Sequence, residues 1–149
     1  MQLDFPEYQF KLKKDKTGDT HIFDKYRKKW IICNPEEWVR QNLLRYLNEN
    51  LNYPENLIAI EKKLVIAKRT LRFDALIYNK DYKPLVIIEC KAPNIKITQE
   101  TFDQIFTYNH LIKAPYLLVT NGLFHVFCKI DDDKKFSFIE KIPDFRDIG

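Results

Sequence analysis

Two charged residues near the middle of the chain have the types and spacing of a catalytic centre. Glu89 and Lys91 follow an apolar run at residues 85–88, which is typical of a strand buried on both faces. Because side chains alternate along a strand, Glu89 and Lys91 share one face and Cys90 points the other way. Charged groups at the end of a buried strand are costly unless an oppositely charged group meets them. We therefore expect a divalent metal ion and a phosphodiester at this position.

Asp74 lies on the strand that the alternation of apolar residues predicts over residues 71–78. A turn at residues 79–84 would then pair Tyr78 with Leu85, Leu76 with Ile87, Asp74 with Glu89 and Arg72 with Lys91. Opposed residues have Cβ atoms about 5 Å apart, so the two carboxylates repel unless a cation lies between them. A slip of one residue would move Asp74 to the other face, and the sequence leaves this alternative open.

The pair of carboxylates suggests a particular metal. Mg²⁺ prefers hard oxygen ligands, keeps several water molecules and binds phosphate oxygens, so it suits an incomplete set of carboxylates on two strands. It would polarise a phosphodiester and lower the pKa of a bound water. Lys91 would steady that water or the charge that develops on the phosphate. The alternative is that Asp74, Glu89 and Lys91 are only solvated charges at the end of a sheet.

Composition sets the class of protein. The 149 residues are 45% hydrophobic, which predicts one domain with one core over residues 1–149. The net charge of +4 is compatible with a nucleic-acid partner without indicating one. Cys33, Cys90 and Cys128 lie far apart without a C-x-x-C pattern, which favours reduced thiols in a cytoplasmic protein. We expect no signal peptide, no transmembrane segment and no membrane partner.

Two helices are predicted to pack on the strands. Asn34 is a suitable N-cap for a helix at residues 35–50, with Pro35 at its first position, acids in the first turn and leucines at helical spacing. Residues 95–112 show helical periodicity, with Thr98 as the expected N-cap.

The predicted strands precede and follow these helices along the chain. They are two short strands flanking a charged turn at 11–19, a strand with a bulge at 57–66, the strand at 71–78, the central strand from residue 85, and strands at 116–120, 123–130 and 136–139. Their order, β-α-β-β-β-α-β-β, predicts an α/β (α+β) fold in which helices pack on a mixed sheet.

The charged residues also resemble a known signature. Asp74…Glu89-Cys90-Lys91 looks like the D…E-x-K signature of the PD-(D/E)XK nuclease superfamily. An ordered set of motifs over roughly residues 30–129 is similar to the N-terminal nuclease domain of type I restriction enzyme R subunits. The motifs are Pro35-Glu36-Glu37-Trp38-Val39-Arg40-Gln41, Arg72-Phe73-Asp74, Ile88-Glu89-Cys90-Lys91-Ala92, Gln104-x-x-x-Tyr108-Asn109 and Thr120-Asn121-Gly122. The resemblance implies a restriction-endonuclease-like mixed sheet flanked by helices, with an α-β-β-β-α-β core.

The resemblance also implies roles for particular residues. Asp74, Glu89 and the main-chain carbonyl of Cys90 would bind the metal, and Lys91 would be catalytic. Glu37 would be an auxiliary acid near the metal. An equal alternative for Glu37 is a first-turn acid favoured by the helix dipole.

The Q-x-x-x-Y motif lies on the second predicted helix. Gln104 and Tyr108 are four residues apart and share one helix face, where the resemblance implies hydrogen bonds to the active-site lysine or to DNA phosphates. The alternative is ordinary packing by Tyr108 beside an exposed Gln104. Asn121-Gly122 is better explained by turn formation than by ligand binding.

The resemblance implies a Mg²⁺-dependent DNA endonuclease in which Mn²⁺ can substitute and metal-activated water attacks the phosphodiester. Five basic residues near Asp74 in sequence are candidate phosphate contacts: Lys62, Lys63, Lys68, Arg69 and Arg72. No G-x-x-x-x-G-K-[ST] pattern is present, so we expect a stand-alone relative or a fragment, with a helicase, translocase or restriction-modification subunit on another chain as a further partner. The main alternative is a DNA-binding or partner-docking module that does not turn over, and a third is hydrolysis of RNA or nucleotides at the same metal site.

Overall fold

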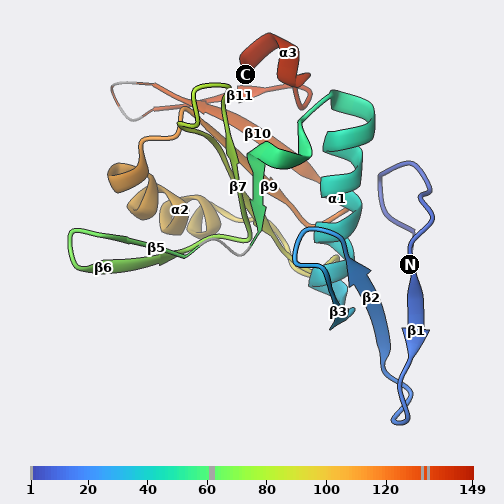
Figure 1. The fold of residues 1–149 in the computed structure, drawn as a ribbon. Helices are drawn as coiled ribbons and strands as arrows, with labels where there is room; N and C mark the ends of the chain where they lie inside the picture. The colour runs from blue at the N-terminus through green and yellow to red at the C-terminus, as the bar shows by residue number, and fades with distance from the viewer. Residues whose placement is uncertain (1, 61–62, 132, 134) are drawn as a thin grey trace.

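The computed structural model of the chain describes residues 2–60, 63–131, 133 and 135–149. Within this part of the chain, six strands form a central sheet in the order β11-β10-β9-β8-β7-β4 (Figure 1). They are β4 (Ile58–Ile60), β7 (Ala75–Tyr78), β8 (Pro84–Cys90), β9 (Tyr116–Thr120), β10 (His125–Ile130) and β11 (Phe136–Ile139). The β8–β9 pair is parallel and the other neighbours are antiparallel, so the sheet is mixed, as predicted.

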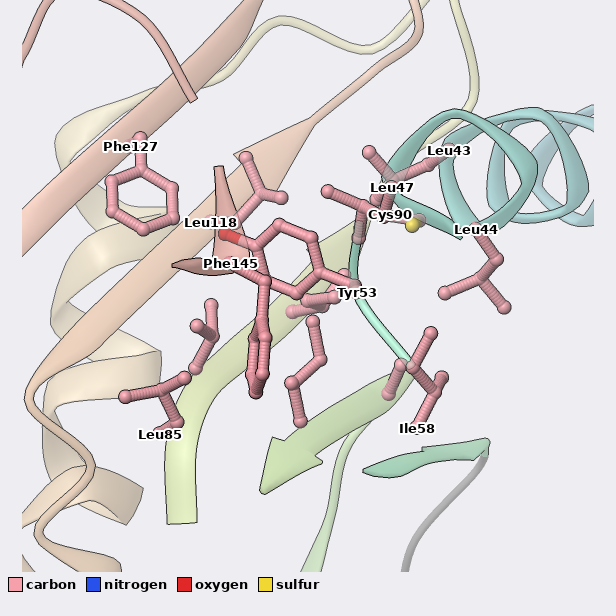
Figure 2. Packing of buried hydrophobic residues seen from close by; sticks show 14 of the residues in the cluster. Leu43, Leu44, Leu47, Tyr53, Ile58, Leu85, Cys90, Leu118, Phe127 and Phe145 are labelled. Atoms are coloured by element: carbon pink, nitrogen blue, oxygen red, sulfur yellow. The ribbon is translucent and has the colours of Figure 1, made fainter. Parts of the chain in front are cut away.

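Helix α1 (Pro35–Leu51) covers one face of this sheet. It begins as the sequence predicts, because the Asn34 side chain accepts a hydrogen bond from the Glu37 N–H at 2.7 Å. Its buried leucines pack with residues of β8 and β9 in one apolar cluster, part of which Figure 2 shows. The helix ends at Leu51, and its C-cap residue Asn52 adopts the left-handed conformation with φ 62°.

Helix α2 (Gln99–Ile112) covers the opposite face (Figure 1). Strand β8 lies between the two layers and alternates as predicted: Val86, Ile88 and Cys90 belong to the apolar cluster under α1, and Ile87 belongs to the cluster under α2. Cys90 is fully buried, with its sulfur toward α1 (Figure 2). Alternation therefore directs Glu89 to the same side of the sheet as Ile87. The order α1-β4-β7-β8-α2-β9 is the expected α-β-β-β-α-β core.

Two predicted strands are wrong in extent. The strand predicted over residues 57–66 is a 3₁₀ turn (Glu55–Leu57), then β4, then β5 (Lys63–Ile66), which belongs to another sheet. The strand predicted over residues 71–78 is divided between β6 (Arg69–Arg72) and β7, with a bend between them at Asp74. Strands β5 and β6 form a two-stranded hairpin that extends away from the central sheet in Figure 1. Lys62, a candidate phosphate contact, lies outside the described residues.

The pairing of β7 with β8 follows the prediction only in part. Leu76 faces Ile87, as expected. Tyr78 pairs with Pro84 and not with Leu85, because the register shifts at the end of β7. The turn before β8 is therefore one residue shorter than the sequence suggested.

The residues before β7 also depart from the predicted ladder. Arg72 pairs with Lys63 across the β5–β6 hairpin and not with Lys91, because the chain bends between β6 and β7. Asp74 lies at that bend, one residue before β7, and so does not form a ladder pair with Glu89.

The remaining elements frame the sheet. A separate antiparallel sheet precedes α1 and contains β1 (Leu12–Lys14), β2 (Thr20–Asp24) and β3 (Lys29–Ile32). The charged turn predicted within residues 11–19 lies between β1 and β2. A short helix, α3 (Phe145–Ile148), closes the chain. None of the helices in the described ranges is long and apolar enough to cross a membrane.

Candidate active site

Asp74 is held at the end of the β7–β8 hairpin by a main-chain contact. Its Oδ2 atom accepts a hydrogen bond from the Cys90 N–H at 2.6 Å. This bond to a carboxylate is charge-assisted and fixes the Asp74 side chain beside the last residues of β8. The sequence predicted that Asp74 faces Glu89 as a pair of the β ladder. In the structure, a bend at Asp74 and its hydrogen bond to Cys90 place Asp74 beside Glu89.

Glu89 lies half-buried next to Asp74. Burial, the charge of Asp74 and hydrogen bonding with Asp74 raise the pKa of Glu89 to about 8, and the charge of Lys91 opposes this rise. Two carboxylates that cannot both ionise freely retain a proton between them. The same position would stabilise a cation in place of that proton.

Lys91 follows β8 directly. Its backbone N–H donates to the Thr120 carbonyl at 2.8 Å, which ties the end of β8 to the end of β9. Its half-buried ammonium lowers the pKa of both Glu89 and Glu36 by its charge. Lys91 therefore stands among the carboxylates, where an amine could also meet a phosphate.

Glu37 is buried among basic and amide side chains. Its Oε1 accepts a hydrogen bond from Arg27 at 2.8 Å and lies 3.5 Å from Nη1 of Arg40, and its Oε2 accepts from the Gln41 amide at 3.1 Å. Arg40 in turn lies 3.5 Å from Asp74 Oδ1. The Glu37 carboxylate thus positions the arginine that contacts Asp74, and it shows no direct contact with Asp74 or Glu89 among the described interactions.

Glu36 is the acid on α1 that faces the carboxylates, and the sequence interpretation did not single it out. Burial and then the charge of Asp74 raise the pKa of Glu36, and Arg40 and Lys91 lower it. Glu36 therefore lies within electrostatic reach of Asp74 and Lys91. The sequence held no signal to separate Glu36 from Glu37, because both acids lie in the first turn of α1.

The Q-x-x-x-Y motif lies on α2. Gln104 is exposed, and no hydrogen bond to the described residues of the site is present. Tyr108 lies in the helix, but its side chain is outside what the structure describes. The Asn121 amide forms a turn, as predicted: its oxygen accepts from Leu123 N–H at 3.0 Å and Phe124 N–H at 2.8 Å, so β10 begins later than expected.

A cleft of about 470 Å³ opens beside the carboxylates. Asp74, Glu89, Lys63, Arg72 and Phe73 line it. Within the described ranges, no three His, Cys, Asp or Glu side chains are grouped closely enough to hold a metal ion by themselves. The donor set is thus two adjacent carboxylates, with Glu36 nearby and main-chain carbonyls at the strand ends. This set is compatible with Mg²⁺, because Mg²⁺ commonly uses one or two carboxylates and completes its shell with water and phosphate.

The fold has counterparts among solved structures. A fragment structure described as an HsdR subunit of a type I restriction enzyme from Vibrio vulnificus YJ016 is 18% identical with a TM-score of 0.58, over 78% of this chain and 24% of that chain. The type IIG restriction endonuclease BpuSI is 25% identical with a TM-score of 0.46, over 72% of this chain and 12% of that chain. This chain therefore spans less than a quarter of the length of either of these two proteins. The first likeness shows the restriction-endonuclease-like fold.

Sequence comparison identifies the family. No curated protein matches the chain. The family model described as type I restriction enzyme R protein N terminus matches residues 35–143, which include helices α1 and α2, the central sheet and the cleft. The chain therefore belongs to the family of type I restriction enzyme R protein N-terminal domains.

Proposed function

We propose that this domain is a Mg²⁺-dependent DNA endonuclease that hydrolyses phosphodiester bonds. The observation that carries the proposal is the pair of adjacent carboxylates, Asp74 and Glu89, in a cleft that Lys63 and Arg72 also line. Lys91 follows β8 directly, and its charge acts on Glu89. Membership of the restriction enzyme family supports a nuclease role in general. The metal, the DNA substrate and the roles of single residues are our proposals.

The ligands proposed for Mg²⁺ are the carboxylates of Asp74 and Glu89 and the main-chain carbonyl of Cys90. The raised pKa of Glu89 supports a cation position, because a bound cation would replace the proton that the carboxylates retain. Glu36 is the better candidate for an auxiliary acid on α1, since its pKa responds to Asp74 and Lys91 and the Glu37 carboxylate is already paired with arginines. When bound, Mg²⁺ would supply the Lewis acidity that phosphodiester hydrolysis needs. Mn²⁺ is the expected substitute.

The remaining chemistry falls to side chains of the chain itself. The Lys91 ammonium would donate to a phosphate oxygen as negative charge develops there, in a half-buried position where such a contact is stronger than in water. Arg40 contacts Oδ1 of Asp74, the oxygen that does not accept from Cys90, and Glu37 contacts Arg40. These contacts are made before substrate arrives, so the side chains need little reorganisation on binding.

A second candidate is a DNA-binding module that does not turn over. Both oxygens of Asp74 already have partners, namely the Cys90 N–H at 2.6 Å and Arg40 at 3.5 Å. An Asp74 that keeps these partners would bind metal poorly. Relatives are longer than this chain, so we further propose that cleavage in the cell involves a helicase, translocase or other restriction-modification subunit.

Incubation of the purified domain with supercoiled plasmid tests the first proposal against the second. We expect nicked or linear DNA with Mg²⁺ or Mn²⁺, none with EDTA, and none from the Glu89→Gln variant with either metal. A parent protein that binds plasmid but never cuts it with either metal would contradict the endonuclease proposal and favour the module. A parallel incubation with single-stranded RNA would show whether the substrate is DNA.

A further inference from the structure

The β5–β6 hairpin has two different faces. Leu64 pairs with Leu71, and together with Ile66 these residues pack in the apolar cluster under α2. This packing ties the hairpin to the body of the domain on one side. The hairpin is therefore an anchored arm that extends away from the central sheet (Figure 1).

The other face of the arm points away from that cluster and carries basic residues at the end of the hairpin that is farthest from its turn. Lys63 pairs directly with Arg72, and one step further out the exposed Val65 pairs with the exposed Thr70. Lys63 and Arg72 also line the cleft that contains Asp74 and Glu89. The arm thus presents two adjacent cations at the mouth of the candidate active site.

These two cations are poorly explained by the folded chain alone. Like charges directly opposite each other destabilise an antiparallel pair. Within the described part of the chain, the side chains of Lys63 and Arg72 form no ion pair and no hydrogen bond, although two carboxylates line the same cleft. An external anion that met both side chains would remove the repulsion.

We propose that the β5–β6 hairpin is a DNA-binding arm in which Lys63 and Arg72 bind backbone phosphates next to the phosphate at Asp74 and Glu89. The inference rests on the proposed function for its substrate and adds a binding surface that the catalytic residues do not include. Arg is suited to two-pronged contact with a phosphate, and Lys is suited to a point contact. Lys68 at the tip and Arg69 on the packed face are not part of this contact.

The size of the arm fits duplex DNA. Four extended residues in each strand span about 13 Å, since each residue of a strand adds about 3.3 Å. This length matches roughly four base-pair steps, since each step of a DNA strand rises 3.4 Å. The major groove is about 12 Å wide and admits a two-stranded ribbon. The exposed Val65 and Thr70 would then lie along the duplex beyond the two phosphate contacts.

Equilibrium binding of a fluorescein-labelled 20-base-pair duplex of mixed sequence, measured by anisotropy in EDTA over a series of salt concentrations, tests the arm without requiring cleavage. We expect Lys63→Gln and Arg72→Gln each to weaken binding roughly eightfold at about 0.1 M salt and to reduce the slope of log K against log salt by about 0.9, the effect of one lost phosphate contact. Arg69→Gln is the matched control, because it removes the same charge three residues along the same strand on the other face. Its affinity should stay within about twofold of the parent.

Three results would overturn the arm: equal losses for Arg69→Gln and Arg72→Gln, an unchanged slope in both test variants, or a parent that does not bind the duplex. Failure of the nuclease proposal gives a different pattern, in which the parent cuts no plasmid but binding still depends on Lys63 and Arg72 and not on Arg69. Conversely, a parent that cuts plasmid while all three variants bind alike would retain the nuclease and reject the arm. Unfolding curves in EDTA should show that no variant is less stable than the parent, since the three side chains are exposed and Lys63→Gln or Arg72→Gln removes one of two opposed like charges.

Discussion

Replacing Glu37 with glutamine separates a structural role from a metal-binding role at the start of α1. The Glu37 carboxylate is 7% exposed and contacts Arg27 at 2.8 Å and Arg40 at 3.5 Å. Glutamine keeps the size of the side chain but removes the charge that compensates two guanidinium groups. Arg27 retains Asp24 and Arg40 retains Asp74, so the loss should lie at the lower end of the range for a broken buried ion pair, about 3 kcal/mol.

That loss should lower the Tm of the metal-free protein by about 6–12 °C, because 1 kcal/mol corresponds to about 2–4 °C in a domain of this size. Thermal unfolding followed by far-UV circular dichroism, first in EDTA and then with Mg²⁺, measures both roles. Glu37→Gln should melt lower in EDTA and still show the Mg²⁺-induced rise.

Glu36→Gln is the matched variant, because it makes the same change one residue away, on a side chain whose charge interacts with Asp74 and Lys91. It should melt close to the parent in EDTA and show a smaller rise with Mg²⁺. The reasoning is refuted if Glu37→Gln melts like the parent in EDTA and loses the rise with Mg²⁺, since Glu37 would then be the metal ligand that the sequence suggested.

Three further predictions concern the carboxylates and one turn. Asp74→Ala and Glu89→Ala should each abolish the Mg²⁺-induced stabilisation, which for the parent should reach about 2.7 kcal/mol at about 100 times the Kd, and differential scanning calorimetry would reveal a site elsewhere if both variants kept it. The stability of the metal-free parent should fall as pH rises from about 4.3 to about 8, because unfolded Glu89 ionises at the lower value and folded Glu89 keeps its proton until the higher one. In Glu89→Gln this contribution should vanish, and urea unfolding at a series of pH values would contradict the assignment if the two proteins kept parallel profiles. Gly122→Ala should destabilise the fold by roughly 1–3 kcal/mol, because Gly122 has φ +88° and its added Cβ would lie 2.8 Å from Leu3 Cδ2 and 3.0 Å from Val39 Cγ2; an unchanged urea midpoint would show that the N-terminal segment does not pack there.

The sequence predicts the elements whose signals are local. Asn34-Pro35 with acids behind it specifies the start of α1, and the alternation in β8 places Cys90 in the core. The prediction of one strand over residues 71–78 was wrong for a physical reason. Its alternation of apolar residues continues through the bend at Asp74, because Leu71 packs against α2 from the hairpin while Leu76 packs there from the central sheet. Periodicity records which side is buried and does not show that the strand changes sheets.

The candidate site shows the same division between local and tertiary information. The residue types Asp, Glu and Lys at their spacing predict that Asp74, Glu89 and Lys91 come together. The structure brings Asp74 and Glu89 into one cleft, and the charge of Lys91 acts on Glu89. The roles of Glu36 and Glu37 differ because Arg27 pairs with Glu37. Arg27 lies ten residues before Glu37, in the turn between β2 and β3. No pattern within the helix contains that information.

The most direct test of the central claim is the cleavage rate of Lys91→Ala measured together with its metal and DNA binding. Lys91 acts on the reacting phosphate in this account and does not hold the metal. Lys83→Ala is the matched control, because it removes the same charge from the exposed turn at the other end of β8. We predict that Lys91→Ala keeps the Mg²⁺-induced rise in Tm and most of its affinity for duplex DNA but cuts plasmid about 10²-fold more slowly or worse, the scale of removing one oriented donor. Lys83→Ala should cut at the parent rate. A Lys91→Ala variant that cuts plasmid as fast as the parent would contradict the account, since the residue at the centre of the proposed site would then be a surface charge.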